Sequence, residues 1–225
     1  MKADYSNQTD IFDPKSWIYP VHVIGAGGIG SAVLFPLMKL GVHEIHVWDR
    51  DDVEPHNIPA QLLYRTSDIG MSKVDAVRAF AERQEVQCRV VPHNEFVSEG
   101  TALDGVVISG VDSMKSRHAI WDAVRFNVDV PLYMDGRIGG EAFGLYALNP
   151  SDVDEIDAYE ATLFPDEDAA PLPCAARTVI HPPTVLAGHI VANLTHFARG
   201  IASKPSLNVH LKTTQFLVGN SRPVQ

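Results

Sequence analysis

Cysteine is scarce in this sequence, and basic residues are fewer than acidic ones. Among 225 residues there are only two cysteines, Cys88 and Cys174, which excludes a disulfide framework, a Cys-x-x-Cys pair and therefore a cysteine-rich zinc site. The 18 Lys and Arg residues are outnumbered by 28 Asp and Glu residues, giving a net charge of −10. This charge argues against binding to nucleic acid or to an anionic membrane, because both require basic patches. The acidity suits either a basic partner or solubility alone.

Long hydrophobic runs are absent as well. No charged-then-apolar leader opens the sequence, and no apolar segment approaches the length of a membrane span, so the sequence predicts a cytoplasmic protein. Hydrophobic residues make up 45% and charged residues 20%, which is ordinary for a globular chain. A chain of this length suits one domain with a large core.

The most informative stretch lies between residues 19 and 49. An apolar run over residues 21–24 predicts a buried parallel strand, and the letters GAGGIG follow it. A helical pattern then ends at Gly41, and a second apolar run over residues 45–48 leads into Asp49. A strand, glycine turn, helix, strand and acidic residue in this order are typical of a nucleotide-binding βαβ unit.

Each part of this unit has its own physical reason. Gly25 allows the tight turn, while Gly27 and Gly28 let the backbone approach phosphates without a Cβ in the way. The helix that follows Gly30 presents free N–H groups and a partial positive charge to an anion. Asp49 can accept hydrogen bonds from ribose hydroxyls. The pattern predicts a nucleotide but leaves open which one.

The remaining pattern predicts the fold class. Residues 1–17 are polar and aperiodic, which indicates an N-terminal arm outside the core. A helix through residue 84 with Ser72 as its N-cap is expected, followed by elements at residues 86–91 (strand), 106–109 (strand), 114–126 (helix) and 132–135 (strand). Strands that alternate with helices in this way predict an α/β, Rossmann-like, doubly wound and mainly parallel sheet.

The pattern changes after residue 135. An antiparallel extension near the C-terminus is expected, with a strand at residues 142–148, a helix at 183–199 and either one more strand or a hairpin over 209–218. Residues 149–173 are rich in Asp, Glu, Pro and Ala with little periodicity, which predicts a long surface loop. Residues 137–141 follow the fifth strand at the sheet end where ligands bind, and they suit either contact with an extended substrate tail or a plain loop.

Three further motifs follow the acidic residue. The first, D-x-D-x-V-x-x-x-N-x-x-x-Q, contains Asp49, Asp51, Asn57 and Gln61, and the second and third are GMSKV around Lys73 and VDSMKSR around Asp112. With the glycines, these motifs resemble the ThiF/MoeB/ubiquitin-activating superfamily of adenylating enzymes. The family pattern is GxGGxG, D-x-D-x-V-x-x-x-N-L-x-R-Q, G-x-x-K-V and T-D-N-x-x-x-R. The resemblance covers residues 19–148 and continues more weakly to about residue 200.

The resemblance implies an adenylyltransferase that binds ATP and Mg²⁺ and needs no zinc. Its substrate would be the C-terminal carboxylate of a ubiquitin-like protein or peptide, and it would act as a homodimer. Residues 18–225 would form a single ThiF-like adenylation domain in which residues 149–173 are a crossover-type loop. The family roles fall on the following residues: Gly25, Gly27, Gly28, Gly30, Asp49, Asp51, Asn57, Gln61 and Lys73 for the nucleotide, Lys73 and Asp112 for catalysis, and Asp112 for the metal.

Several features keep alternatives open. Ala60 stands where the family has an arginine, and no arginine precedes Arg50 in the N-terminal segment. These departures suit a degenerate, non-catalytic scaffold subunit. An oxidoreductase that uses a nicotinamide or flavin fits the glycine unit but leaves the Lys73 and Asp112 motifs unexplained. The alternative for Asp112 is a cap of the helix that follows it, and the alternative for Arg117 is an exposed position on the surface of that helix.

Cys174 ends the acidic loop in the segment PLPCAARTV. The segment looks like the one around the thioester cysteine of compact ubiquitin-activating enzymes, which implies an acyl acceptor activated by a helix N-terminus and by Arg177 or His181. The alternative is a buried small hydrophobe, as most free cysteines are. Cys88 lies inside the apolar strand expected at residues 86–91 and is expected to be structural.

Overall fold

The computed structural model describes residues 3–84, 87–165, 167, 179–202 and 206–219. Its strands and longer helices follow the chain in this order: β1 (Val21–Ile24), α1 (Gly28–Leu40), β2 (Glu44–Trp48), α2 (Lys73–Arg83), β3 (Arg89–His93), β4 (Val106–Ser109), α3 (Met114–Val124), β5 (Leu132–Gly139), β6 (Ala142–Leu148), α4 (Val153–Glu160), α5 (His181–Ala198), β7 (Ser206–His210) and β8 (Gln215–Gly219). Among the described residues, no helix is both long enough and apolar enough to span a membrane.

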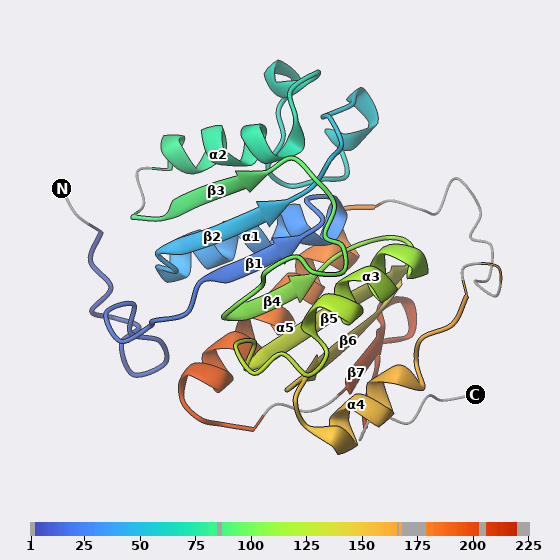
Figure 1. Ribbon diagram of the computed structural model, residues 1–225. Helices are drawn as coiled ribbons and strands as arrows, with labels where there is room; N and C mark the ends of the chain where they lie inside the picture. The colour runs from blue at the N-terminus through green and yellow to red at the C-terminus, as the bar shows by residue number, and fades with distance from the viewer. Residues whose placement is uncertain (1–2, 85–86, 166, 168–178, 203–205, 220–225) are drawn as a thin grey trace.

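Short apolar strands form the centre of one eight-stranded sheet, ordered β3-β2-β1-β4-β5-β6-β7-β8 (Figure 1). The first five strands pair in parallel, with β1 between β2 and β4 and buried along its whole length. The last three strands run antiparallel from β5 onward. The expected Rossmann-like fold class with its antiparallel C-terminal extension is therefore confirmed.

Helices cover both faces of this sheet and enclose two apolar layers (Figure 1). One layer packs side chains of α1, α2 and α5 against the strands, for example Leu34, Val77 and Ile190. The other packs α3 and α4 through Trp121 and Tyr159 against the opposite face. Because strands β1 to β5 run in parallel, their C-terminal ends lie at one edge of the sheet, where the turns that follow β1, β2 and β4 meet.

The N-terminal segment belongs to the core, so the expectation of an arm outside it is wrong. Phe12 and Trp17 are 2% and 5% exposed, and Trp17 stacks edge-on against Tyr19 and Phe197. The Gln8 side chain donates to the Leu40 carbonyl at 2.6 Å and so caps the end of α1. The segment is aperiodic because isolated aromatic anchors, rather than a helix or strand, fix it.

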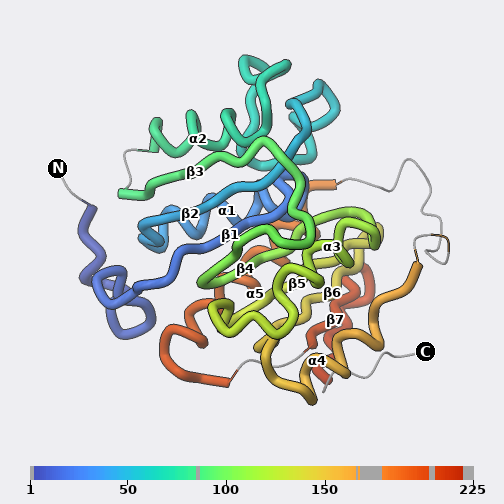
Figure 2. Tube along the Cα trace, viewed as in Figure 1, coloured from blue at the N-terminus to red at the C-terminus, as the bar shows by residue number. Residues whose placement is uncertain are grey.

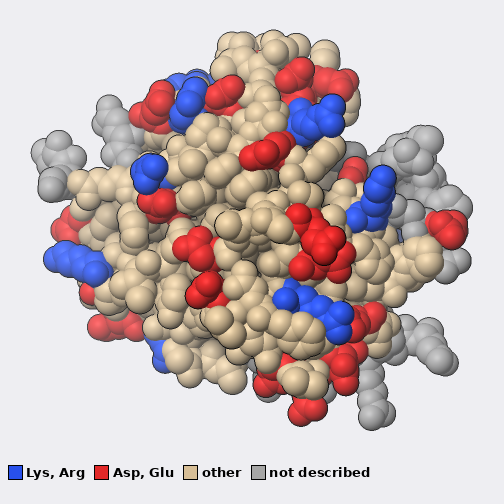
Figure 3. All heavy atoms as spheres, in the orientation of Figure 1, with Lys and Arg blue, Asp and Glu red and all other residues tan. Residues whose placement is uncertain are grey.

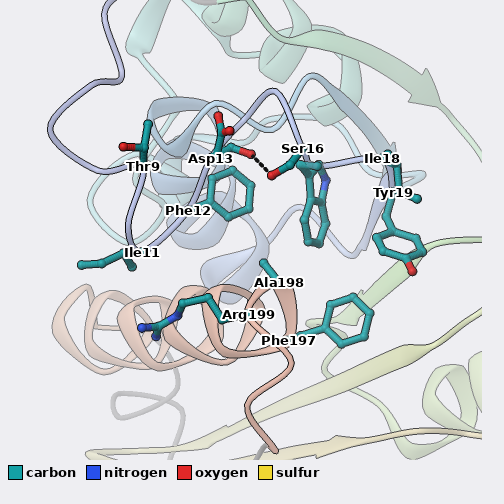
Figure 4. A pocket seen from close by; sticks show the side chains of 11 residues that line it. Thr9, Ile11, Phe12, Asp13, Ser16, Ile18, Tyr19, Phe197, Ala198 and Arg199 are labelled. Carbon is teal, nitrogen blue, oxygen red and sulfur yellow. Dashed lines mark hydrogen bonds between the residues drawn. The ribbon is translucent and has the colours of Figure 1, made fainter.

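The N-terminal segment also meets the end of α5 (Figure 2). The two line a cavity of about 340 Å³ that contains Phe12, Tyr19 and Phe197 (Figure 4). This cavity lies beside the residues that lead into β1, at the end of the sheet opposite the glycine turn.

The expectation of a loop over residues 149–173 is wrong for residues 153–160, because they form α4; residues 166 and 168–173 of that range lie outside the described residues. The Asp152 side chain accepts from the N–H groups of Asp154 and Glu155 and so starts the helix. Ile156 and Tyr159, three residues apart, are each 1% exposed and anchor its inner face. Two buried side chains in eight residues are too short a pattern to register as periodicity.

Smaller boundaries also differ from the prediction. The third strand is β3 at Arg89–His93 rather than residues 86–91. The fifth strand extends to Gly139, so residues 137–139 are strand rather than loop, and a tight turn at Gly140 with φ of +61° leads into β6. The predicted helix at residues 183–199 begins earlier, because prolines fit the first turn of a helix, and α5 starts at His181. The C-terminal hairpin is confirmed as β7 and β8.

Three histidines lie on neighbouring strands on the α3 side of the sheet: His22 on β1, His46 on β2 and His93 on β3. His22 stacks on His46 at 4.5 Å between ring centroids, and the Trp48 indole N–H donates to Nδ1 of His22 at 3.1 Å. The side chain of His22 is 3% exposed. Burial, and after it the neighbouring His46, lowers the pKa of His22 to about 4, although Asp104 at 3.2 Å opposes the shift.

His22 should therefore make the fold labile to acid. The unfolded chain binds this proton near pH 6.5 and the folded chain only near pH 4, so the stabilisation present at neutral pH is lost as the pH falls through this window. The full shift corresponds to about 3 kcal/mol. Urea denaturation at pH 7 and pH 4.5 should show a smaller loss of unfolding free energy in His22→Gln than in the wild type. His43→Gln, which changes an exposed histidine, should keep the wild-type pH dependence. An equal loss of unfolding free energy between pH 7 and pH 4.5 in all three proteins would contradict a role of His22 in acid lability.

Candidate nucleotide site

The turn between β1 and α1 depends on two glycines. Gly25 has φ of +88°, and a Cβ there would approach the Gly110 carbonyl and the Val111 side chain. A Cβ at Gly30 would overlap the carbonyl oxygen of Gly25, so α1 packs directly on the turn. Gly25 therefore fits the tight turn predicted from the sequence, and Gly30 lets α1 pack closely on that turn.

The start of α1 is open in a way that suits an anion. A Cβ at Gly27 would meet nothing within 4 Å, and one at Gly28 would reach only Pro183 at 4.0 Å. Gly27 is the N-cap residue and gives no side-chain cap, and the first turn contains no acidic residue. The first turn of α1 therefore supplies no carboxylate of its own to compete for its N–H groups, and free N–H groups of this kind bind phosphate at helix N-termini.

Asp49 and Lys73 lie directly beside this turn. Asp49 follows β2 and accepts from the Ala26 N–H at 2.7 Å and from the Asp51 N–H at 2.8 Å. The Lys73 ammonium lies 2.8 Å from Asp51 Oδ2 and 3.8 Å from Asp49 Oδ1, with its side chain 7% exposed. Burial raises the pKa of Asp49, and the Lys73 charge opposes that rise. A buried cation thus stands next to the open glycine turn.

Local structure explains why Lys73 reaches this position. The Lys73 N–H donates to the Asp51 carbonyl at 2.9 Å, so the loop after β2 is joined to the start of α2. The Ser72 side chain accepts from the Asp75 N–H and caps α2, as the sequence predicted. The structure therefore brings together Asp49, Asp51 and Lys73, three of the predicted nucleotide residues, beside the glycines.

Asn57 and Gln61 are both buried, but their side chains differ in their hydrogen bonding. The Asn57 side chain accepts from the Glu54 N–H at 2.8 Å and so shapes the loop. Gln61 is 8% exposed, and its Oε1 atom has no hydrogen-bond partner among the described residues. The adjacent Leu62 N–H donates to Ser31 in the first turn of α1. An unpaired buried oxygen beside this turn fits a missing donor from a ligand or water.

Asp112 reaches the same edge from β4. The Gly110 N–H donates to the Ile24 carbonyl, which places the Asp112 loop against the glycine turn. Asp112 is exposed, and it does not cap α3, because the Ser113 hydroxyl accepts from the Ser116 N–H instead. Among the described residues, no group of three or more His, Cys, Asp or Glu side chains is placed to hold a metal ion. One carboxylate with ligand phosphates is nevertheless a common way to bind Mg²⁺.

Two site features were not predicted from the sequence. The Tyr64 hydroxyl donates to the Ala26 carbonyl at 2.7 Å and supports the glycine turn from the loop side. Arg117, for which an exposed helix surface was one option, is 4% exposed and donates to Asp135 and to the Val111 carbonyl. A single charged residue after an apolar strand, as at Asp135, was the available signal.

Ala60 stands where the family pattern has an arginine, and Arg50 and Arg65 are the arginines that lie in the same stretch of the chain. Ala60 itself is 4% exposed. The Arg50 guanidinium lies over the Phe96 ring at 5.3 Å, on the loop after β3, and Arg65 is exposed. Charged side chains of both signs are interspersed on the face shown in Figure 3, where acidic groups outnumber basic ones.

The two cysteines differ. Cys174 and the neighbouring Arg177 lie outside the described residues. Cys88 is free and packs against the core, and burial raises the pKa of its thiol to about 12. Its thiolate is therefore strongly disfavoured at neutral pH, which agrees with the structural role expected for it.

The sequence is similar to a known protein family and to several curated proteins. A family model described as the ThiF family matches residues 18–223. The chain is 36% identical over 102 residues to the NEDD8-activating enzyme E1 catalytic subunit of Caenorhabditis elegans, which covers 44% of this chain and 24% of that protein. It is 33% identical over 119 residues to the SAMP-activating enzyme E1 of Haloferax volcanii, which covers 50% of this chain and 43% of that one. Each match spans less than half of the relative.

The fold also has counterparts among solved structures. The crystal structure of E. coli MccB with AMPCPP and MccA superimposes with a TM-score of 0.73 at 16% sequence identity. That match covers 96% of this chain and 67% of the other. At this identity the likeness concerns the fold.

The Gly25–Gly30 contact gives a direct test of the turn. Gly30→Ala should lower the unfolding free energy by roughly 1–3 kcal/mol, because its methyl group overlaps a backbone oxygen. The matched variant Gly28→Ala adds a methyl group that has only ordinary contacts, and its stability should remain within about 0.5 kcal/mol of the wild type. Urea denaturation of the three proteins measures both effects. Equal stability in the two variants would contradict the packing described for this turn.

Proposed function

Because the chain belongs to the ThiF family, we propose that it catalyses the ATP-dependent adenylylation of a C-terminal carboxylate on a ubiquitin-like protein or peptide. The curated relatives are named as activating enzymes for NEDD8 and SAMP, which supports this class of substrate. The observation that carries the proposal is the buried Lys73, held by Asp49 and Asp51 beside an uncapped helix N-terminus.

These groups suit the chemistry of acyl adenylate formation. A carboxylate oxygen attacks the α-phosphorus of ATP, the bond from this phosphorus to the bridging oxygen breaks, and pyrophosphate leaves. Negative charge on the phosphates must be offset while this occurs. In the proposed arrangement the α1 N-terminus and Lys73 contact phosphate oxygens, and Asp49 holds the ribose. Lys73 lies 2.8 Å from the exposed Asp51, so the lysine must release this carboxylate to reach a phosphate.

The remaining predicted residues would hold the metal ion and line the nucleotide site. Asp112 would hold Mg²⁺, which supplies electrostatic neutralisation of the phosphates when it is bound. Gln61 offers its unpaired Oε1 to the nucleotide, and Asn57 keeps the loop in shape. Residues 18–225 would act as one adenylation domain. A homodimer is also proposed, with support from the exposed apolar side chains Phe216, Leu217 and Val218 on the edge strand β8.

A scaffold without catalysis is the second candidate function. It is favoured by Ala60 at the family's arginine position and by Arg50, whose guanidinium packs on Phe96 instead of lying free. This candidate predicts ATP binding without pyrophosphate turnover. An oxidoreductase leaves the Lys73 arrangement without a purpose.

ATP–pyrophosphate exchange with candidate ubiquitin-like proteins and peptides tests the proposal. Lys73→Ala and Asp112→Asn should each lower the exchange rate about 100-fold, the usual effect of removing one group that stabilises transition-state charge. The matched variants are Lys39→Ala, in the last turn of α1, and Asp122→Asn, at an exposed position of α3. Both should retain the wild-type rate. ATP binding by the wild type without exchange in the presence of any candidate partner would favour the scaffold.

Cys174 is proposed to accept the acyl group after adenylylation. Thiolate attack on the acyl carbon would release AMP and form a thioester. Cys174→Ala should therefore retain pyrophosphate exchange and lose a partner conjugate that is cleaved by dithiothreitol, as seen on non-reducing gels. Cys88→Ala, which removes the buried thiol, should form the conjugate normally. A conjugate that persists in Cys174→Ala would remove this cysteine from the reaction.

A further inference from the structure

A buried cluster of charged and phenolic side chains lies behind the Asp112 loop, and the proposed reaction does not use it. We call Arg117, Asp135, Arg137 and Tyr159 the Asp135 cluster. Asp135 is fully buried and lies on β5 opposite Ser109, the last residue of β4. Its carboxylate accepts from Arg117 Nε at 2.9 Å, from Arg137 Nε at 2.7 Å and from the Tyr159 hydroxyl at 3.0 Å.

The two arginines lead from Asp135 in different directions. Arg117 also donates from Nη2 to the Val111 carbonyl at 2.9 Å, so it holds the residue that immediately precedes Asp112. Arg137 donates from Nη1 to the Thr162 carbonyl at 2.9 Å and from Nη2 to the Thr162 hydroxyl at 3.0 Å. Thr162 lies two residues beyond α4. One carboxylate therefore joins the Asp112 loop to the end of α4.

The charges explain why this connection is rigid. Asp135 is shared by two guanidinium groups, and its two oxygens accept three hydrogen bonds between them. Burial, and after it the Asp135 charge, raises the pKa of Tyr159 well above its usual value, so this phenol keeps its proton and remains a donor. Arg137 also lies over the Tyr146 ring at 4.4 Å. A buried carboxylate deprived of one donor must find another, because an unpaired charge in this position is costly.

We propose that Asp135 is a positioning residue that couples the Asp112 loop to the end of α4, so that loosening either segment loosens the other. This inference rests on the proposed function only for its consequence, which is the placement of Asp112 for Mg²⁺·ATP. The coupling itself follows from the shared carboxylate and is reciprocal, as any equilibrium coupling must be.

Hydrogen–deuterium exchange on the full chain tests the coupling in both directions. Tyr159→Phe removes the hydrogen bond to Asp135 from the α4 side, together with the 3.2 Å contact between the Tyr159 and Tyr133 hydroxyl groups. Arg117→Lys shortens the connection from the α3 side. A hydrogen bond is worth about 1 kcal/mol, or roughly a fivefold change in an opening equilibrium. Tyr159→Phe should therefore raise exchange about fivefold in residues 111–117, and Arg117→Lys should raise it in residues 159–165. The control is Tyr146→Phe, which removes a hydroxyl from the same ring cluster and should leave exchange in residues 111–117 unchanged.

Two results would overturn the coupling. One is a change confined to the segment that carries the substitution. The other is an equal effect of Tyr146→Phe on residues 111–117, because this would indicate general loosening of the aromatic layer.

Ligand affinity separates positioning from a merely structural role. Tyr159→Phe should raise the Kd of Mg²⁺·ATP about fivefold and leave the Kd of AMP unchanged, since AMP would bind through the Asp49 side of the site. Calorimetric titration measures both constants, and an equal weakening of both would contradict positioning of Asp112. If the wild type binds no Mg²⁺·ATP, the proposed function fails, whereas the exchange measurement still decides the coupling.

Discussion

The ion pair of Lys73 with Asp51, with Asp49 close by, fixes the site on which the rest of this account depends. Asp49 is bound to the glycine turn through the Ala26 N–H, and Lys73 begins α2, so this arrangement joins β2, the turn and the next helix. A lysine buried to this degree needs a carboxylate partner. The partner Asp51 is largely exposed, with 66% of its side chain accessible. In the proposed function, Lys73 would move to an incoming phosphate and water would then solvate the Asp51 carboxylate. The ion pair is thus both a structural link and a preformed cation.

The parallel half of the fold was predictable because its signals are local. Apolar runs of four or five residues, glycines at fixed spacing and a serine N-cap at Ser72 identify β1, α1, β2, β4 and α2 with small errors at their ends. The residues of the candidate nucleotide site follow from the same spacing, because the C-terminal ends of parallel strands lie at one edge of the sheet. The resemblance of four motifs added the family, which the matched range confirms.

What the sequence did not predict depends on contacts between distant residues. Phe12 and Trp17 join the core through Phe197, almost two hundred residues away, and no periodicity announces this. The helix α4 depends on two buried side chains, and the buried Arg117 of α3 is neutralised by Asp135, which lies on β5. Asp112 would equally suit a cap by its position, and only the Ser113 hydrogen bond shows that the cap is filled by another residue.

The central claim is that a carboxylate attacks the α-phosphorus of ATP in this site. It is tested most directly with a partner whose C-terminal carboxylate carries ¹⁸O, incubated with the wild-type chain, Mg²⁺·ATP and hydroxylamine to trap the acyl group. The account predicts AMP that contains one ¹⁸O atom, because the attacking oxygen remains on phosphorus when the acyl group is transferred. Unlabelled AMP, or label recovered in inorganic phosphate alongside ADP, would contradict it.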